Sequence, residues 1–411
     1  MGARRLNKQA NFFGLPDVPT GYSQMPNWSV VVPLLYDETN MVNNPSFEIG
    51  DTNYEHTASG SEILIRSTDQ QYFGAYSLTL SIDTSPGAGG RQGIIYGVIT
   101  PLSFTSGIDY VISAYFYSAV GGRRFLIGVT PTGSNTLLAQ KQFFSTGFWQ
   151  RIWLVYRETS TNNRRITITN DSVQGIADGA STAFFIDGVQ VCATPSGENP
   201  VLTTYIDGDQ TGLTPNEFPP PYYWSGTPHL SQSVRSAFTR HGGKIVNFRE
   251  LGLDHVASTG LGLVVPDHTS LPYGQLDGET FQRTQKNSRI FSLAGRVTGR
   301  SIIHLDSLFS SLSNEMDTDS SPRREPLLLK YQPMDEEENP TGPELDVVAT
   351  YNGGLESSRD NLNTELFTLN FKQYDPALLS HTEGSLLTVN TTITNSDGIL
   401  RRDQDGSWSR L

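Results

Sequence analysis

Short apolar runs, separated by turn residues, fill the chain between residues 41 and 195. Several of them alternate apolar with polar positions, as in YVISAYF from Tyr110 to Phe116, and Val, Ile, Thr and aromatic residues dominate them. Evenly spaced short strands of this kind are typical of a β-sandwich, and no helical period of useful length interrupts them. We therefore predict a two-sheet antiparallel jelly roll over residues 41–195.

A second β-rich stretch lies between residues 239 and 378, where runs such as SRIFSLAGRVTG and ELFTLNFKQYDP have the composition of strands. Between them, SIIHLDSLFSSLSNEM places apolar residues at helical spacing, namely Ile302, Ile303, Leu305, Leu308, Phe309 and Leu312. We predict one amphipathic helix across a mostly antiparallel sheet, an α+β unit of split-barrel type. The acidic run MDEEENP, residues 334–340, is interpreted as a solvated loop.

Three further segments flank or join these two units. Residues 1–40 are irregular apart from the apolar run WSVVVPLLY, which we expect to be an extended segment packing on a neighbouring subunit or domain. Residues 196–238 are rich in Pro, Gly and polar residues, and three consecutive prolines at 219–221 favour an extended conformation, so this stretch is predicted to be a connector. Residues 379–411 form a C-terminal extension in which two Asp-Gly turns flank a short strand.

The composition fits a mainly β chain and excludes several classes of protein. Of 411 residues, 36% are hydrophobic and 39 are glycine, which is typical of β-rich domains with many loops. No run approaches the roughly 20 apolar residues of a transmembrane helix. No apolar run follows the basic N-terminus, so we expect neither a secretory signal nor membrane insertion. The single cysteine, Cys192, rules out an internal disulfide and a cysteine-based zinc site.

The motifs of common enzymes are absent from the sequence. There is no nucleophile elbow, phosphate-binding loop, zinc-protease motif or dinucleotide-binding motif. The seven histidines are scattered without the spacing of metal ligands. We expect no catalytic residues. A pair of carboxylates for polysaccharide hydrolysis stays open as an alternative, because such residues need not be neighbours in the chain.

Two stretches bound the first β-rich unit and carry a family resemblance. NNPSFEIGD opens it at residues 43–51, YFGAYSLTLS follows at residues 72–81, and FFIDGVQV closes it at residues 184–191. Together they resemble jelly-roll carbohydrate-binding modules. The resemblance implies a structural calcium ion near the first and last strands, with Glu48 and Asp187 as its ligands. No other cofactor is expected. Alternatively, these two carboxylates cap strands or accept hydrogen bonds from the backbone.

Sugar binding by such a module requires exposed aromatic rings beside polar groups. The candidates are Tyr54, Tyr72 and Trp149, and Phe73 and Tyr117 are further aromatic residues of the same region. Because most aromatic residues of a sandwich belong to its core, each of them has a structural role as its alternative.

The unit at residues 239–378 resembles the tail component family of long-tailed phages, whose best-known members are distal tail proteins. The features that carry the resemblance occur in the family's order: Asp277-Gly278, RIFSLAG at residues 289–295, the amphipathic helix, YNGG at residues 351–354, and Asp375-Pro376. The resemblance implies a ring, usually a hexamer, that joins the tail tube to the baseplate or tail-tip hub and has no catalytic site. This chain departs from the common layout because its jelly roll precedes the ring unit.

The resemblance therefore implies a structural virion protein at the phage tail tip, assembled in the host cytoplasm. Its partners would be copies of itself, the tail tube protein, the hub protein and host surface glycans. Phage DNA would pass through the lumen without specific binding, and the net charge of −13 suits this because an acidic wall does not hold phosphates. Acidic residues, among them Asp335–Glu338, are expected to face the lumen. A dedicated receptor-binding protein that attaches to host carbohydrate is the alternative, and a wall hydrolase is a further one.

The connector contains an aromatic stretch, YYWSGTPHLSQS, directly after its prolines. Tyr222, Tyr223 and Trp224 have enough area to anchor the connector on a domain face, while Asp207 and Asp209 make turns before it. We predict an ordered connector that fixes the angle between the two units. A sugar platform and a flexible linker are the two alternatives.

Overall fold

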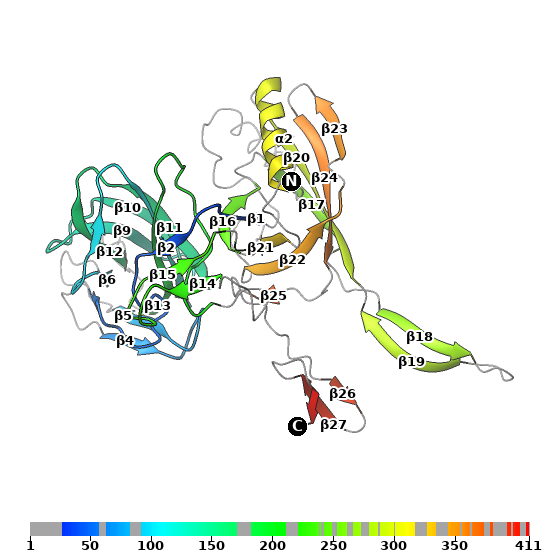
Figure 1. The fold of residues 1–411 in the computed structure, drawn as a ribbon, viewed down its shortest axis with the longest axis horizontal. Helices are drawn as coiled ribbons and strands as arrows, with labels where there is room; N and C mark the ends of the chain where they lie inside the picture. Colours follow the sequence, from blue (N-terminus) through cyan, green and yellow to red (C-terminus); the bar gives the residue numbers. More distant parts are fainter. Residues whose placement is uncertain are drawn as a thin grey trace.

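The computed structural model of this chain (Figure 1) describes most residues from 27 to 410. The described ranges are 27–56, 63–82, 92–170, 182–210, 221–237, 239, 242–248, 253–260, 266–272, 279–286, 288–299, 301–316, 327–333, 344–353, 356–361, 364–373, 379–380, 393–395, 398–402 and 408–410. The acidic run 334–340, prolines 219 and 220, and the predicted turns at 277–278 and 375–376 lie outside them. No helix in the described ranges is long and apolar enough to cross a membrane.

Two antiparallel sheets form the jelly roll. The first has the order β10-β9-β12-β6-β3, with β7 also paired to β12; its strands are β3 (Tyr54–His56), β6 (Gly93–Tyr96), β7 (Leu102–Phe104), β9 (Arg124–Pro131), β10 (Ala139–Phe144) and β12 (Asn162–Asn170). The second has the order β11-β8-β13-β5-β4; its strands are β4 (Ile63–Ser67), β5 (Ser77–Ile82), β8 (Asp109–Ser118), β11 (Gln150–Arg157) and β13 (Thr182–Ala193). The predicted mainly β fold with a jelly roll is confirmed.

The core of the jelly roll lies between these sheets because alternate residues of each strand face inward. On β8, Ile112, Ala114 and Phe116 belong to this core, whereas Tyr115 belongs to a separate cluster on the outer face. The five-stranded sheet therefore carries a second layer on its outer side. This layer consists of Tyr72, Phe73, Tyr115 and Tyr205, with Trp149 packed against it.

The C-terminal unit is a nine-stranded sheet with one helix. Its path is β16-β1-β21-β22-β24-β20-β17, with β23 paired to β24 and β25 paired to β22. The strands are β1 (Asn27–Pro33), β16 (Gly243–Asn247), β17 (Leu253–Thr259), β20 (Arg289–Thr298), β21 (Leu327–Gln332), β22 (Leu345–Tyr351), β23 (Glu356–Asn361), β24 (Thr364–Gln373) and β25 (Leu379–Ser380). The helix α2 (Ile302–Met316) buries Leu305 in the core of this unit, and Leu308 and Phe309 pack against that core.

Strand β1 belongs to the N-terminal segment that was expected to pack on a neighbouring subunit or domain. It lies inside the nine-stranded sheet, where Val30 pairs with Val246 of β16 on one side and with Leu329 of β21 on the other. Trp28 is buried there, with its ring 5.9 Å from that of Phe291. The segment thus belongs to the C-terminal unit of its own chain. Consequently, the jelly roll is an insertion between two neighbouring strands, β1 and β16.

The two chain segments that enter and leave the jelly roll are themselves paired. Strand β2 (Glu38–Asn40) leads into the module, and β14 (Tyr222–Trp224) and β15 (Ser233–Arg235) lead out of it. They form a three-stranded sheet in the order β14-β15-β2. Glu38 and Arg235 face each other across it as a buried ion pair. The described part of the connector is therefore ordered and packed.

Two β elements project from this body (Figure 1). The hairpin of β18 (Pro266–Pro272) and β19 (Glu279–Lys286) extends away from the nine-stranded sheet. Near the C-terminus, β26 (Ile393–Asn395), β27 (Gly398–Arg402) and β28 (Trp408–Arg410) form a small separate sheet. Among the described strands, neither element pairs with any strand outside itself.

The position of Trp28 makes a prediction about stability. Replacing Trp28 by Ala removes a buried ring that contacts Phe291 and Tyr331, so we expect the free energy of unfolding of the C-terminal unit to fall by about 3–5 kcal/mol. Hydrogen exchange of β21 and β22 measures this loss locally. Leu35→Ala, at a side chain 67% exposed, is the matched control. Unchanged protection of β21 in Trp28→Ala would contradict the assignment of β1 to this sheet.

Candidate functional site

The two carboxylates predicted to hold calcium fasten one loop, residues 70–76. Asp187 is fully buried on β13, where its Oδ2 accepts hydrogen bonds from the backbone N–H groups of Tyr72 and Phe73, both at 2.8 Å. Its Oδ1 accepts one from Gly188 at 2.7 Å. Burial raises the pKa of Asp187 well above its usual range, although these backbone N–H groups favour the charged form.

Glu48 holds the other side of the same loop. Its Oε1 accepts hydrogen bonds from the backbone N–H groups of Ala75 at 2.9 Å and Tyr76 at 3.2 Å. Backbone N–H groups therefore point at both carboxylates. This agrees with the alternative role, in which Glu48 and Asp187 accept hydrogen bonds from the backbone. This is not the cage of oxygen atoms that calcium requires. Calcium binding by Glu48 and Asp187 stays a prediction.

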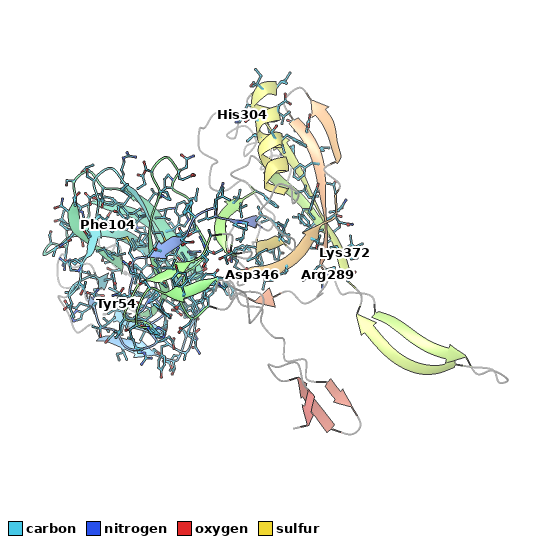
Figure 2. All side chains as sticks on the ribbon, viewed as in Figure 1. Tyr54, Phe104, Arg289, His304, Asp346 and Lys372 are labelled. Carbon is cyan, nitrogen blue, oxygen red and sulfur yellow. The ribbon has the colours of Figure 1, made fainter. Side chains whose placement is uncertain are left out.

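Tyr54, one of the candidates for sugar binding, lies in the core of the jelly roll. Figure 2 labels Tyr54 within this unit. Its side chain is only 6% exposed, and its ring lies 4.8 Å from the rings of both Phe47 and Tyr96. The expectation of an exposed ring is corrected here, because the side chain of Tyr54 points between the two sheets. A ring enclosed in this way offers no face to a sugar.

Tyr72 and Trp149 are brought together on the outer face of the five-stranded sheet. Tyr72 is 6% exposed because its ring stacks on Tyr115 at 4.0 Å. Trp149 is half-buried, and its ring lies 5.7 Å from that of Tyr72. Of the three candidates, Trp149 alone is therefore not buried and keeps part of its side chain accessible to solvent.

Trp149 continues into a row of residues that crosses the five-stranded sheet. Its ring lies 5.6 Å from Tyr117 of β8, which lies 5.9 Å from Phe185 of β13. Phe185 pairs with Thr79 of β5, and Thr79 pairs with Ile65 of β4. We call these five residues the transverse row: Trp149, Tyr117, Phe185, Thr79 and Ile65. All five are half-buried or exposed.

Phe185, Thr79 and Ile65 are not among the site residues predicted from the sequence. The alternation along FFIDGVQV does place Phe185 opposite to the core residues Phe184 and Ile186, so its outward position could have been inferred. Phe185 lies beside Tyr117 because β13 pairs with β8. This pairing joins segments that are far apart in the chain, so the sequence does not reveal it.

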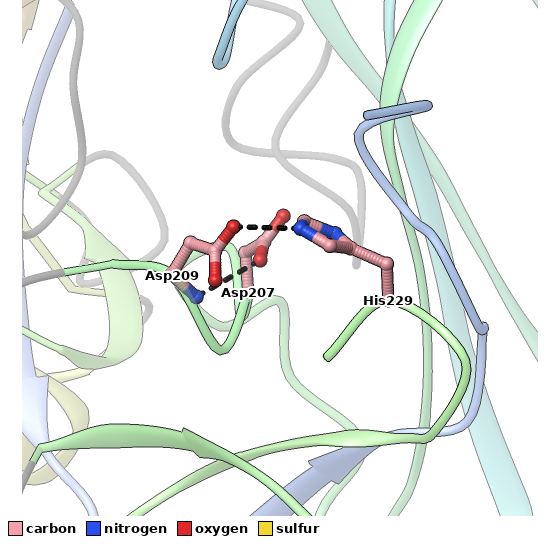
Figure 3. A group of neighbouring side chains, drawn as sticks. All are labelled: Asp207, Asp209 and His229. Carbon is pink, nitrogen blue, oxygen red and sulfur yellow. Dashed lines mark hydrogen bonds and ion pairs between the residues drawn. The ribbon is translucent and has the colours of Figure 1, made fainter. Parts of the chain in front are cut away.

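A second group of polar residues lies where the connector meets the jelly roll (Figure 3). The Nε1–H group of Trp224 donates to Asp209 Oδ1 at 2.8 Å, and His229 Nε2 lies 2.9 Å from Asp209 Oδ2. The ring of Trp224 covers Gly208, where a Cβ atom would lie 2.5 Å from it. Only glycine at position 208 permits this contact.

Asp207 ties the same group to the opening strand of the module. It is almost fully buried, and its Oδ2 accepts hydrogen bonds from Ser46 Oγ at 2.6 Å and from the Tyr205 hydroxyl at 3.0 Å. Its Oδ1 accepts a hydrogen bond from the backbone N–H of Asp209 at 3.1 Å. Burial raises the pKa of Asp207, and the bonds from Ser46 and Asp209 partly oppose that rise.

Asp207, Asp209 and His229 also have the chemistry of metal ligands. One ligand atom from each lies within 4.8 Å of the others, and within the described ranges no other such group of three is found. One imidazole nitrogen with two carboxylate oxygens is a donor set that suits zinc. Each of the three is already hydrogen-bonded or ion-paired to a protein group. Without a metal, the group fastens the connector to the module.

Of the three predicted connector anchors, Tyr222 and Trp224 pack against the protein and Tyr223 does not. Tyr222 is buried against Cys192 of the jelly roll and Ile206 of the connector itself, and Trp224 is half-buried over Gly208. Tyr223, between them, faces solvent. Strand alternation explains this division, because β14 presents residues 222 and 224 to the same side.

Comparisons with known proteins bear on the fold. No family model and no curated protein matches this chain. A xylan-binding family 22 module of Paenibacillus barcinonensis is similar over 41% of this chain and 99% of its own length, at 16% identity and a TM-score of 0.27. The tailspike protein 4 domain of bacteriophage CBA120 is similar over 38% of this chain and 21% of its own, at 13% identity and a TM-score of 0.28.

Larger enzymes are also similar over part of their length. A Clostridium thermocellum xylanase with its family 22 module is similar over 40% of this chain, at 19% identity and a TM-score of 0.29. The chain spans 30% of that structure and 31% of a similar arabinofuranosidase. All of these are similarities of fold.

A substitution at Gly74 tests whether the loop held by Glu48 and Asp187 stabilises the module. It adopts a φ of +60°, and a Cβ atom there would lie 2.2 Å from Glu48 Oε1. We expect Gly74→Ala to lower the free energy of unfolding of the module by at least about 1 kcal/mol. Urea denaturation measures the change, and Gly133→Ala is the matched control, since it shares a positive φ but has open space around it. Equal losses in both variants would show that backbone conformation alone matters.

Trp224 tests the role of the connector group. Trp224→Ala removes the hydrogen bond to Asp209 and uncovers Gly208, so we expect the connector to be cut faster in limited proteolysis while both sheets stay folded. Mass spectrometry of the fragments locates the cut. Tyr223→Ala is the control because that side chain faces solvent. If Trp224→Ala resists protease as well as the control does, the group does not fix the connector.

Proposed function

We propose that this chain is a structural subunit of a phage tail tip. It is a ring-forming adaptor, expected to be hexameric, between the tail tube and the baseplate or tip hub, and its jelly roll contacts host surface glycans. The observation that supports this most directly is the pair of β elements that find no partner strands among the described residues of their own chain.

The hairpin β18–β19 is the larger of these elements. An isolated two-stranded hairpin is at best marginally stable in water, so it requires contacts from another chain to persist. The nine-stranded sheet adds an open edge at β17, where its path ends, whereas its other end strand, β16, is already hydrogen-bonded to residues 202–204 of the same chain. Unpaired strand edges are templates for further pairing. A ring subunit needs two different surfaces for its two neighbours, and a projecting hairpin with an open sheet edge is such a combination.

The insertion of the jelly roll between β1 and β16 supports its role as a displayed module. Because those two strands are hydrogen-bonded to each other, the chain leaves the C-terminal sheet and returns to it at one place. A module attached there leaves the rest of the sheet open to neighbouring subunits. This arrangement accounts for a jelly roll that precedes most of the ring unit in sequence.

The acidic balance of the chain is compatible with the passage of DNA. Its net charge of −13 disfavours binding of DNA, because phosphate groups are held by an excess of Lys and Arg side chains. The acidic run 334–340 lies outside the described residues, so its position facing the lumen stays a prediction.

Electron microscopy of the purified chain in negative stain tests the ring. We expect particles with six-fold symmetry and a central hole. A variant in which residues 266–286 are replaced by a short Gly-Ser turn removes the hairpin and is expected to shift the particles to monomers. Monomers of the unmodified chain at every concentration, with or without tail tube protein, would contradict the ring-forming role and favour a dedicated attachment protein.

A further inference from the structure

The transverse row belongs neither to the core of the jelly roll nor to its contact with the connector. We propose that it binds an extended chain of pyranose sugars, which lies across the strands of the five-stranded sheet and stacks on Trp149, Tyr117 and Phe185. This inference rests on the proposed function, in that it supplies the site by which the displayed module contacts glycans.

The floor of the site is defined by strand pairing. Tyr117 pairs with Phe185, Phe185 with Thr79, and Thr79 with Ile65, while Trp149 immediately precedes β11 beside Tyr117. Because neighbouring strands lie about 4.8 Å apart, five positions span about 19 Å. Three consecutive aromatic rings, 5.6 Å and 5.9 Å apart, cover more than half of this length. A ligand that follows the row must therefore be long and narrow.

The residues on the two sides of the row differ in size. On one side, Tyr72 and Phe73 form the second aromatic layer above Tyr115 and make a ridge. On the other side, Ala183 and Ser81 are paired, small and exposed. On that side, only the small side chains of Ala183 and Ser81 lie next to the rings of Tyr117 and Phe185. A strip about one residue wide suits a polysaccharide better than a folded protein, whose interface covers about 800 Å² per partner.

Polar groups lie beside the rings, as carbohydrate recognition requires. Arg151 is two residues from Trp149 on the same face, where its Nη2 donates to Ser113 Oγ at 3.2 Å and its guanidinium lies 5.3 Å from the Tyr115 ring. The Thr79 hydroxyl lies within the row itself and donates to the Phe184 carbonyl at 3.1 Å. Its lone pairs remain as acceptors for a sugar hydroxyl.

The row also lies away from the attachment point of the module. The connector covers the other end of the same sheet face, where Tyr222 and Ile206 pack on Cys192. Cys192 pairs with Val111, six positions before Tyr117 on β8, which corresponds to about 20 Å. Among the described residues of the six-stranded sheet, the outward positions of the central strands β9 and β12 are Leu126, Gly128, Thr130, Arg165, Thr167 and Thr169, none of which is aromatic.

Binding of defined sugars to the full chain tests this site. Isothermal titration with cellohexaose, xylohexaose and polygalacturonate is expected to show binding of at least one of them. Trp149→Ala and Phe185→Ala each remove a stacking ring and should weaken that binding about tenfold. Tyr223→Ala, an exposed aromatic residue on the connector, should leave it unchanged. Ile65→Asp, at a side chain 51% exposed, tests the row without disturbing buried contacts and should also weaken binding.

The outcomes separate this inference from the proposed function. If the chain forms rings but binds none of the three sugars, or if Ile65→Asp and both ring variants bind as the unmodified chain does, the row is not the site and the tail role stands. If the sugars bind through the row but no ring forms, the site stands and the adaptor role fails. Dimerisation of the purified chain that Phe185→Ala abolishes would show that a second copy covers the row, and would overturn the inference.

Discussion

The pairing of β1 with β16 is the contact on which the rest of the structure depends. Ser29 to Pro33 pair residue by residue with Asn247 to Gly243, although more than the whole jelly roll separates them in sequence. This ladder closes a very long loop, whose entropic cost grows only slowly with its length. The chain can therefore carry a complete second fold inside one antiparallel pair of the nine-stranded sheet.

Buried polar groups then fix how the inserted module is held. Asn40 is fully buried, and its side chain donates to the carbonyls of Val189 and Ile206 and accepts from the backbone N–H of Val191. The buried pair of Glu38 and Arg235 joins the entering strand to the leaving one. Removing one member of such a pair would leave an uncompensated buried charge, which is strongly unfavourable. These contacts join the entering strand β2 to the leaving strand β15 and to β13 of the module.

The sequence was informative where structure is local. Alternation predicted the strands of the jelly roll, and helical spacing predicted the helix at Ile302–Met316. Strand pairing is non-local, and for that reason the sequence did not show which subunit or domain WSVVVPLLY packs on, although Val30 and Val32 are core residues of the C-terminal unit. The same limit applies to the candidate site. Tyr54 and Trp149 are both aromatic residues next to loops, and only the register of β3 and of β11, which begins directly after Trp149, places one in the core and the other on the surface.

Strand β13 links the features that the proposed role requires. It carries Phe185 in the transverse row, Asp187 under the loop at residues 70–76, and Cys192 under the connector. Its partner β8 runs beside it over the same length, with a bulge between Asp187 and Gln190. A ligand on the row and the connector at the far end therefore contact the same two central strands. A polysaccharide bound as proposed would therefore act on the same strand pair, β8 and β13, that carries the contact with the connector at Cys192.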